Sequence, residues 1–293
     1  RPSAVRVAHL SYDGALDPLG STQVVPYLEG LSRLGVHVDL ITFEKPSRLR
    51  DLGRRSSMLA RLSRAGIAWH ALRYHHAPRV PATVYDIARG AVLLRRLTGR
   101  SGFDLFHCRG AITPVMVRLA RLDGPLLLDM RGFFSDERVD AGSWVAGGGL
   151  DRVVRAMEAQ NLKRAWRVVV LTARGRDVLR ERGVTLPIDV VPTCVDCCKF
   201  NRPDSSTEEF DLVYFGSLGG WYLTQEMIEF VLYVRKVGPP ARVLFLTNNI
   251  DESSASLLRA AGVTVQSAAP EDVPGWLAKC RATFFFIKAS ASK

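Results

Sequence analysis

The sequence predicts an α/β fold with parallel sheets, arranged as two domains. Short apolar runs recur along the chain and alternate with segments of helical periodicity, which is the pattern of a doubly wound sheet. The length of 293 residues corresponds to two domains at roughly 100–200 residues each. A polar stretch at 200–209 (FNRPDSSTEE) separates two such series of elements and is predicted to be a linker.

The chain opens with a strand, a helix and a second strand. Residues 5–10 (VRVAHL) form a short apolar run that predicts a buried parallel strand. Gly20 then lies in a loop that leads into a predicted helix over 22–34, which Gly35 ends. Residues 36–43 (VHVDLITF) are the next predicted strand, which completes the first unit of a doubly wound sheet.

The same alternation continues through the first domain, which is predicted to span 1–199. After 36–43, strands are predicted over 67–70, 105–107, 125–130, 168–171 and 188–191. Helices are predicted over 58–65, 85–97, 112–122, 150–165 and 172–179, and 131–149 is predicted to be a loop. The first domain therefore holds about seven strands with helices between them.

The second domain is predicted to span 210–293 and to be incomplete. Strands are expected over 210–215, 242–246, 263–265 and 282–287, with helices from 224, over 253–261 and over 273–279. The chain stops shortly after the last of these strands, whereas a domain of this type ordinarily closes with further helices. We therefore expect the parent protein to be longer.

Composition excludes several classes of protein. Hydrophobic residues make up 47% and charged residues 24%, as in folded globular proteins and unlike disordered chains, collagens or coiled coils. No run approaches the roughly 18 apolar residues that a membrane span needs, and no secretory signal opens the chain. The expected location is the cytoplasm.

Five cysteines do not predict a disulfide framework, because their number is odd and the chain is not small. Cys194, Cys197 and Cys198 have the spacing of half a zinc site, but no second pair of Cys or His follows at suitable spacing. We expect reduced thiols and no bound metal.

The formal charge of +11 is unevenly distributed. Residues 1–189 hold 30 Lys and Arg and 18 Asp and Glu, whereas residues 190–293 hold 10 and 11. A basic first domain favours an anionic partner such as a phosphate or an anionic membrane surface. A basic surface that is merely solvated is the alternative.

Two glycine-containing loops are candidates to bind phosphate, since each follows the first strand of its domain, where ligands of open α/β sheets bind. Glycine lets the backbone approach a ligand closely, and helix N-termini attract anions. An ordinary strand-to-helix loop is the alternative for both. The candidate residues are Gly20 and Ser21 in the first loop and Gly216, Ser217, Gly219 and Gly220 in the second, with Lys288 after the last predicted strand.

Polar residues after other strands of the first domain are candidates to bind an acceptor. Arg131 could hold a phosphate or carboxylate in bidentate geometry, and Asp136 or Glu137 could act as a base or contact the acceptor. An internal ion-pair loop and a structural histidine are the alternatives. The other candidates are Tyr12, Asp13, His107 and Arg109. No nucleophile–base pair stands out, so no catalytic residue is assigned.

One segment resembles a known family. Residues 191–200 (VPTCVDCCKF) are similar to the interdomain segment V-[IP]-P-N-G-V-D-x-x-[RK]-F of family 4 glycosyltransferases, with Thr193 and Cys194 in place of Asn and Gly. Residues 10–28, 165–172 (AWRVVVLT), 212–218 (LVYFGSL) and 273–282 (VPGWLAKCRA) are similar to further segments of that family, in the same order.

The resemblance implies a GT-B-like fold, in which two Rossmann-like domains with parallel sheets face a cleft. It implies an N-terminal acceptor domain, a C-terminal domain for the nucleotide-sugar donor, and metal-independent transfer with retention at the anomeric carbon. Two features depart from the family. Ser217 and Tyr222 stand where many relatives have Arg and Lys on the donor phosphates, and the E-x7-E element would lie beyond Lys293. The fragment alone is therefore expected to be inactive.

The predicted function is that of a hexosyltransferase-like enzyme, with a nucleotide-diphosphate sugar as donor substrate and no other cofactor. The predicted acceptor is a cell-envelope, lipid-linked or other glycan, as in polysaccharide biosynthesis. The basic first domain favours peripheral docking at the inner face of the membrane. The alternatives are a non-catalytic nucleotide-sugar-binding remnant and another GT-B enzyme, such as a nucleotide-sugar epimerase. No nucleic acid is expected, because no such binding motif appears.

Overall fold

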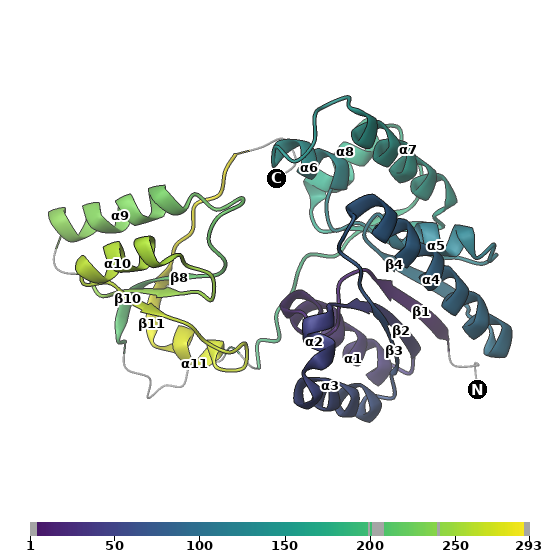
Figure 1. Cartoon of the computed structure of the whole chain (residues 1–293), viewed down its shortest axis with the longest axis horizontal. Coiled ribbons are helices and arrows are strands. Elements are labelled where there is room, and N and C mark those ends of the chain that lie inside the picture. The colour runs from purple at the N-terminus through teal and green to yellow at the C-terminus, as the bar shows by residue number, and fades with distance from the viewer. Residues whose placement is uncertain (1–4, 199, 201–207, 239–240, 290–293) are drawn as a thin grey trace. The chain divides into compact units, whose positions relative to one another are not determined.

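The computed structural model describes residues 5–198, 200, 208–238 and 241–289, and the chain divides into two compact units between Thr193 and Cys194 (Figure 1). The predicted first domain ended at 199, and most of the predicted linker, 201–207, lies outside the described residues. Unit 1 denotes the part up to Thr193, and unit 2 the part from Cys194 on.

Unit 1 is built on a seven-stranded parallel sheet, as the alternating pattern predicted. The strand order is β3-β2-β1-β4-β5-β6-β7, so the direction of winding reverses between β1 and β4. The strands are β1 (Arg6–Ser11), β2 (His37–Glu44), β3 (Ala68–Arg73), β4 (Leu105–Arg109), β5 (Leu126–Asp129), β6 (Arg167–Val170) and β7 (Ile188–Val190).

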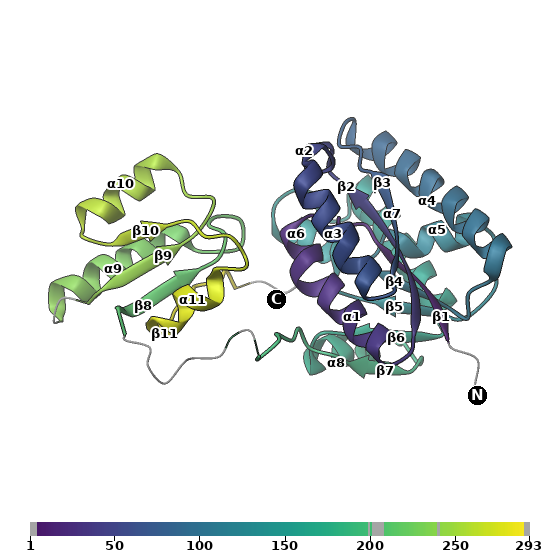
Figure 2. The same cartoon turned by 90° about the horizontal axis from the view of Figure 1, so that it is seen from below.

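Helices cover both faces of this sheet (Figures 1 and 2). One face packs on η1 (Gly20–Val24), α1 (Val25–Arg33) and α3 (Leu52–Arg64), and α2 (Pro46–Arg50) precedes α3. The other face packs on α4 (Arg79–Ser101), α5 (Thr113–Leu119), α7 (Gly149–Arg164) and α8 (Ala173–Glu181). Two apolar cores therefore enclose the sheet, and only its edges and strand ends remain for ligands.

The first helix begins differently from the prediction. Gly20 and Ser21 were predicted to lie in a loop before the helix, but they belong to a wide turn, η1, which no side chain caps. The Val25 N–H donates to the Gly20 carbonyl, five residues back, just before Pro26. Proline lacks an N–H and its ring crowds the carbonyl four residues earlier, so the helix widens by one residue there.

The predicted loop 131–149 also contains a helix, α6 (Phe134–Asp140). The segment is short and polar, with Asp136 and Glu137 in its first turn, so its periodicity gave no signal. Contacts with α7, described below, hold it in place. Thr172, where the last helix of this domain was predicted to begin, caps α8 and accepts a hydrogen bond from the Gly175 N–H at 3.0 Å.

Unit 2 contains a four-stranded parallel sheet in the order β10-β9-β8-β11. Its helices α9 (Thr224–Val237) and α10 (Glu252–Ala260) pack on one face and α11 (Val273–Ala278) on the other (Figure 2). The strands are β8 (Phe210–Phe215), β9 (Val243–Leu246), β10 (Thr264–Gln266) and β11 (Cys280–Thr283).

The last strand begins earlier than predicted. The expected strand over 282–287 is observed as β11, whose Cys280 pairs with Phe210 of β8. The Phe284 N–H still donates to the Val213 carbonyl of β8 at 3.1 Å, but β11 ends at Thr283. Phe284 and Phe286 pack on the apolar core, and Ile287 forms an isolated bridge with Tyr222. Phe284 and Phe286 are partly buried and Phe285 is exposed, and periodicity alone does not distinguish such an apolar run from a strand.

Candidate functional site

Charged side chains gather at the carboxyl ends of β1, β4 and β5, where the winding of the sheet reverses. The register aligns Ser11 with Arg109 and Arg109 with Asp129, and Arg131 follows β5 by two residues. Gln23 of η1 lies across them, and its Oε1 accepts hydrogen bonds from Arg109 Nη2 at 3.1 Å and Arg131 Nη2 at 3.3 Å. Ligands of doubly wound sheets bind at such a switch point.

The ion pairs of this edge cluster are loose. Arg109 Nη1 lies 3.8 Å from Asp129 Oδ2, Arg131 Nη1 lies 3.5 Å from Asp129 Oδ1, and Arg109 Nε lies 3.7 Å from Asp13 Oδ2. These separations exceed ordinary hydrogen-bond distances. Arg131 also donates to Thr193 Oγ1 at 3.2 Å. We use "edge cluster" for Asp13, Gln23, His107, Arg109, Asp129 and Arg131.

The surroundings shift two pKa values in this cluster. Burial alone would raise the pKa of Asp129, but His107, Arg131 and Arg109 outweigh it and hold that pKa below its usual range. Burial and the positive charge of Arg131 lower the pKa of Arg109, against the opposing effect of the two carboxylates. Asp129 is therefore the ionised partner of two neighbouring guanidinium groups.

Buried polar atoms without a protein partner concentrate here. Among the described residues, seven buried side-chain nitrogens and oxygens lack a hydrogen bond, and five of them belong to His9, His107, Arg109 and Asp129. The rings of His9 and His107 meet edge-on at 4.3 Å, and burial lowers the pKa of His9, so that ring is neutral. Because buried polar groups are ordinarily bonded, these side chains are candidates to bind a ligand or ordered water at this edge.

Tyr27 of α1 borders the edge cluster. Its ring packs edge-on against His107 at 6.0 Å, and 45% of the residue is exposed. Burial of the remainder, with Asp129 nearby, raises the pKa of its hydroxyl. The cluster therefore combines cationic donors, anionic acceptors and one accessible aromatic face.

The structure brings together only some of the predicted acceptor residues. Asp13, His107, Arg109 and Arg131 meet in the edge cluster. Tyr12 instead packs against Phe43 and Tyr74, and its hydroxyl donates to Asp86 Oδ2 at 3.1 Å. Burial raises the pKa of that hydroxyl.

Asp136 and Glu137 lie on α6. Arg155 of α7 and Arg182, which directly follows α8, bind the Asp136 carboxylate at 2.7 Å and 2.8 Å. The Glu137 carboxyl packs against Gly132, where a Cβ would collide with it. Asp136 therefore belongs to an ion-pair group, the alternative considered from the sequence, and no contact with the edge cluster is observed for it.

Glu44 at the end of β2 binds the backbone of the first glycine loop, and this residue was not predicted from the sequence. The buried carboxylate accepts hydrogen bonds from the Ala15 N–H at 2.7 Å, the Leu16 N–H at 3.1 Å and the Thr42 hydroxyl at 2.6 Å. Gly20 is buried against the Gly14 carbonyl, and a Cβ at position 20 would collide with it.

The Ser21 hydroxyl in this loop donates to the Pro18 carbonyl, and the Ser21 N–H donates to the Asp17 carbonyl. Gly20 and Ser21 therefore shape the loop, and their binding of phosphate stays a prediction.

The second glycine loop is held by Asn249 and Thr224. Asn249 Oδ1 accepts from the Leu218 N–H and its Nδ2 donates to the Leu218 carbonyl, both at 2.9 Å. Thr224 Oγ1 accepts from the Gly219 N–H at 2.9 Å. Gly219 and Gly220 have positive φ values of 81° and 63°, which favour glycine.

Ser217 and Lys288 are exposed, and the Lys288 N–H donates to the Trp221 carbonyl at 2.9 Å. Phosphate binding by this loop also stays a prediction.

Two site residues were missed because they depend on tertiary contacts. Gln23 and Asn249 are ordinary helix or loop residues in the sequence, and nothing in their neighbourhood marks them. Glu44 could have been noticed, since a carboxylate that directly ends a long apolar strand must find partners. Asp129 lies in the predicted strand 125–130, and the sequence does not reveal that it pairs with Arg109 and Arg131.

Two further properties of the described residues concern membrane spanning and metal binding. No helix there combines the length and apolar character needed to cross a membrane. In the same residues, no group of three or more His, Cys, Asp and Glu side chains is arranged to hold a metal ion. Cys194, Cys197 and Cys198 are exposed.

Solved structures with a similar fold are glycosyltransferases. A sucrose-phosphate synthase from Thermosynechococcus elongatus aligns with a TM-score of 0.64 and 14% identity, over 95% of this chain and 74% of that one. The lipopolysaccharide outer core galactosyltransferase WaaB in its apo form aligns at 0.58 and 9%, over 97% and 74%. A UGT transferase from Siraitia grosvenorii in complex with UDP aligns at 0.53 and 11%, over 91% and 74%. At these identities the likeness establishes the GT-B fold.

Sequence comparison identifies the family. No curated protein matches the chain. The family model described as a glycosyl transferase 4-like domain matches residues 20–194, which include the edge cluster except for Asp13. Since that match covers more than half of the 293 residues, the chain belongs to the glycosyl transferase 4-like family.

Proposed function

We propose that the protein transfers a hexose from a nucleotide-diphosphate sugar to a hydroxyl of a glycan or lipid-linked glycan, with the edge cluster as the acceptor site. The observation that carries this proposal is the concentration of unpartnered buried donors and acceptors at the switch point of the unit 1 sheet. Family membership and the UDP named with similar structures support the nucleotide-sugar donor.

The chemistry of the edge cluster suits a neutral sugar. Arg109 and Arg131 supply two positive charges, and Asp13 and Asp129 supply two negative charges, so an anion would gain little net attraction. A sugar hydroxyl both donates and accepts, and can therefore use guanidinium and carboxylate groups together. Tyr27 offers the apolar surface on which a sugar ring packs.

Transfer itself requires stabilisation of negative charge on the departing nucleoside diphosphate, which oriented donors supply. The glycine loop of unit 2 is the candidate for this task. Similarity to the family supports transfer without a metal and with retention at the anomeric carbon. Transfer by the full-length protein in the presence of a metal chelator, with the anomer of the product read by NMR, tests both expectations.

Calorimetry with UDP, GDP and ADP separates the proposal from its alternatives. Micromolar binding of one nucleotide, followed by transfer of the matching sugar to a glycan or lipid extract by the full-length protein, is the expected result. Binding without transfer would point to a nucleotide-sugar-binding remnant. Consumption of the sugar nucleotide without any acceptor would point to an epimerase-like enzyme.

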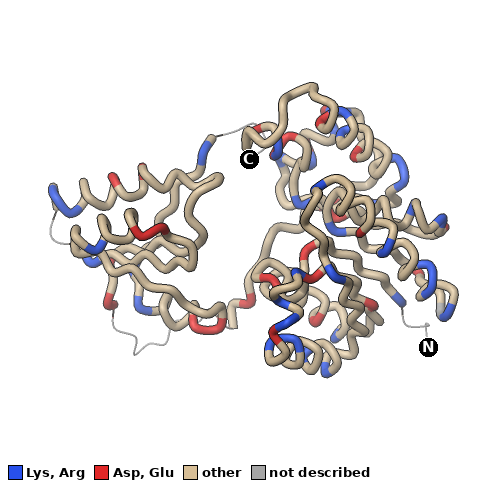
Figure 3. Tube along the Cα trace, in the orientation of Figure 1, with Lys and Arg blue, Asp and Glu red and all other residues tan. Residues whose placement is uncertain are grey.

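We also propose that unit 1 docks on an anionic membrane surface through α2 and α3, at the cytoplasmic face. Residues 45–64 hold seven Lys and Arg and one Asp, and Figure 3 shows this basic stretch along the two helices. Leu52 and Leu59 are 69% and 53% exposed on the outer side of α3, next to the exposed Arg55. Leucines flanked by arginines are typical of helices that lie at a membrane interface.

Vesicle sedimentation tests this docking. Each arginine near an anionic surface is worth about 1 kcal/mol, so the R54Q/R55Q variant is expected to bind anionic vesicles about 30-fold more weakly. The matched control, R95Q/R96Q, removes two exposed charges from α4 and is expected to bind like the unchanged protein. Equal weakening in both variants would assign the effect to total charge, and retention on purely zwitterionic vesicles would contradict the proposal.

A further inference from the structure

A row of polar side chains on α7 holds the segment between β5 and α7. Asp151, Arg155 and Glu158 are spaced four and three residues apart and therefore share one face of the helix. Asp151 accepts from the Gly147 N–H at 2.8 Å and from the Ser135 hydroxyl, and Arg155 binds Asp136. Charged contacts thus tie both the start and the end of this segment to α7.

Glu158 makes the contact nearest to the edge cluster. Its Oε1 accepts from the Phe134 N–H at 3.0 Å, three residues after Arg131. The Met130 N–H, on the other side of Arg131, donates to the Val169 carbonyl of β6 at 2.8 Å. The short turn that carries Arg131 is therefore fixed at both ends, by the sheet and by Glu158.

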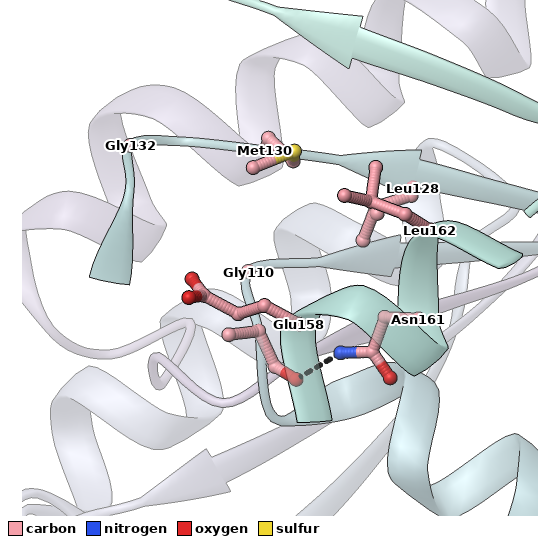
Figure 4. Close-up of a pocket in the computed structure, with 8 residues that line it drawn as sticks. Gly110, Leu128, Met130, Gly132, Glu158, Asn161 and Leu162 are labelled. Carbon is pink, nitrogen blue, oxygen red and sulfur yellow. Dashed lines mark hydrogen bonds between the residues drawn. The ribbon is translucent and has the colours of Figure 1, made fainter. Parts of the chain in front are cut away.

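The surroundings of Glu158 are largely apolar. It lines a small pocket with Leu128, Met130 and Leu162, and its side chain extends toward the Gly132 side of that pocket (Figure 4). Asn161 on the same helix donates to the Ala111 carbonyl at 2.7 Å, which leaves its buried Oδ1 without a partner.

These surroundings shift the titration of Glu158. Burial raises its pKa to about 7, with Asp136 of α6 acting in the same direction, while the Phe134 and Ser135 N–H groups and Arg155 of α7 lower it. The Glu137 carboxyl packs against Gly132 of the same pocket, and Arg182, just after α8, pairs with Asp136. Glu158 therefore changes charge near neutral pH.

We infer that Glu158 is a positioning residue, which fixes the turn 131–134 and so directs the Arg131 guanidinium toward Gln23 and Asp129. The relevance of this to sugar transfer rests on the proposed function, whereas the positioning itself is a property of the fold. Ionisation of Glu158 replaces a neutral acceptor by a carboxylate beside Asp136, so the contact that holds Arg131 depends on pH.

The test follows Arg131 and the turn directly, without any substrate. The Arg131 Nε–H resonance, assigned with R131K, is expected to shift with a midpoint of about pH 7 in the unchanged chain and to stay constant in E158Q. Gln keeps an acceptor oxygen and cannot ionise. In E158A the Phe134 N–H loses its acceptor, and its hydrogen exchange is expected to be about tenfold faster.

A second probe lies in the same segment. The Trp144 ring packs edge-on against Phe134 at 5.8 Å. The fluorescence of Trp144, identified as the part of the emission that is lost in W144F, is therefore expected to titrate with the same midpoint as the Arg131 resonance. The inference would be overturned if each probe, the Arg131 resonance and the Trp144 emission, showed the same pH dependence in the unchanged chain, in E158Q and in E158A. If E158A does not fold, E158Q alone decides, because loss of the titration is required there.

The two proposals fail separately. Loss of titration in E158Q together with absence of sugar transfer in the full-length protein would keep the positioning and reject the proposed function. If the full-length protein transfers sugar but the Arg131 resonance titrates in E158Q and E158A as it does in the unchanged chain, the proposed function stands and the positioning is rejected.

Discussion

Glu44 is predicted to be among the most costly side chains to change in unit 1. Its carboxylate is buried and accepts three hydrogen bonds, from the Ala15 N–H, the Leu16 N–H and the Thr42 hydroxyl. Thr42 in turn accepts from Trp69 Nε1 at 2.8 Å. This network joins β2 and β3 to the loop that follows β1.

The Glu44→Gln variant keeps the shape and removes one acceptor oxygen. If the amide oxygen occupies the Oε1 position, its NH2 group faces the Leu16 N–H, and a buried donor is left unpaired. An unpaired buried group costs about 1–3 kcal/mol, and loss of a charge-assisted bond adds to it, which gives about 2–4 kcal/mol. That is a large part of the roughly 5–15 kcal/mol by which domains are stable.

Urea unfolding followed by tryptophan fluorescence and circular dichroism measures this loss, and Trp69 reports on the network itself. Glu29→Gln is the control, since Glu29 forms a partly exposed bidentate pair with Arg61 between α1 and α3 and is expected to lose about 1 kcal/mol, less than Glu44→Gln. Equal stability of the two variants would refute the reasoning.

Three further predictions concern single contacts. Gly20→Ala forces a Cβ against the Gly14 carbonyl and should lower the urea midpoint of unit 1, and an unchanged midpoint would show that the loop can move apart. Asn249→Ala removes both bonds to Leu218 and should weaken nucleotide binding about tenfold by calorimetry, while an unchanged affinity would separate this loop from the donor site. Burial would raise the pKa of Asp39, but its hydrogen bonds with His70 and Arg6 lower that pKa overall. The ionised Asp39 therefore stabilises the fold at neutral pH, and this stabilisation is lost as the pH falls through the lowered pKa. Asp39→Asn should therefore flatten the acid side of the stability curve, and an equally steep acid side would count against this.

The alternation of apolar runs and helical segments was sufficient to predict both parallel sheets. Strands such as β2 and β9 are buried on both faces, so their sequences are nearly continuous apolar runs that the pattern identifies directly. The errors lie where local pattern carries no information. Pro26 widens the first helix, and α6 depends on charges that α7 supplies.

The edge cluster was predicted in part for a geometric reason. His107 and Arg109 lie in the carboxyl half of β4 and Arg131 follows the neighbouring β5, so their meeting follows from the order of the strands. The sequence did not show that Asp136 lies outside the edge cluster. Its partners Arg155 and Arg182 belong to α7 and to the end of α8, and the sequence does not reveal how these helices pack. Tyr12 was grouped with them, but its side chain joins the aromatic contacts of Phe43.

The central claim is that the edge cluster binds the acceptor of a sugar transfer. It is tested most directly by measuring incorporation of labelled sugar into a glycan or lipid extract by the full-length protein, its R109Q/R131Q variant and the control R95Q/R96Q. The account predicts that transfer is lost in R109Q/R131Q and kept in the control, with nucleotide binding equal in all three. Unchanged transfer by R109Q/R131Q would contradict it.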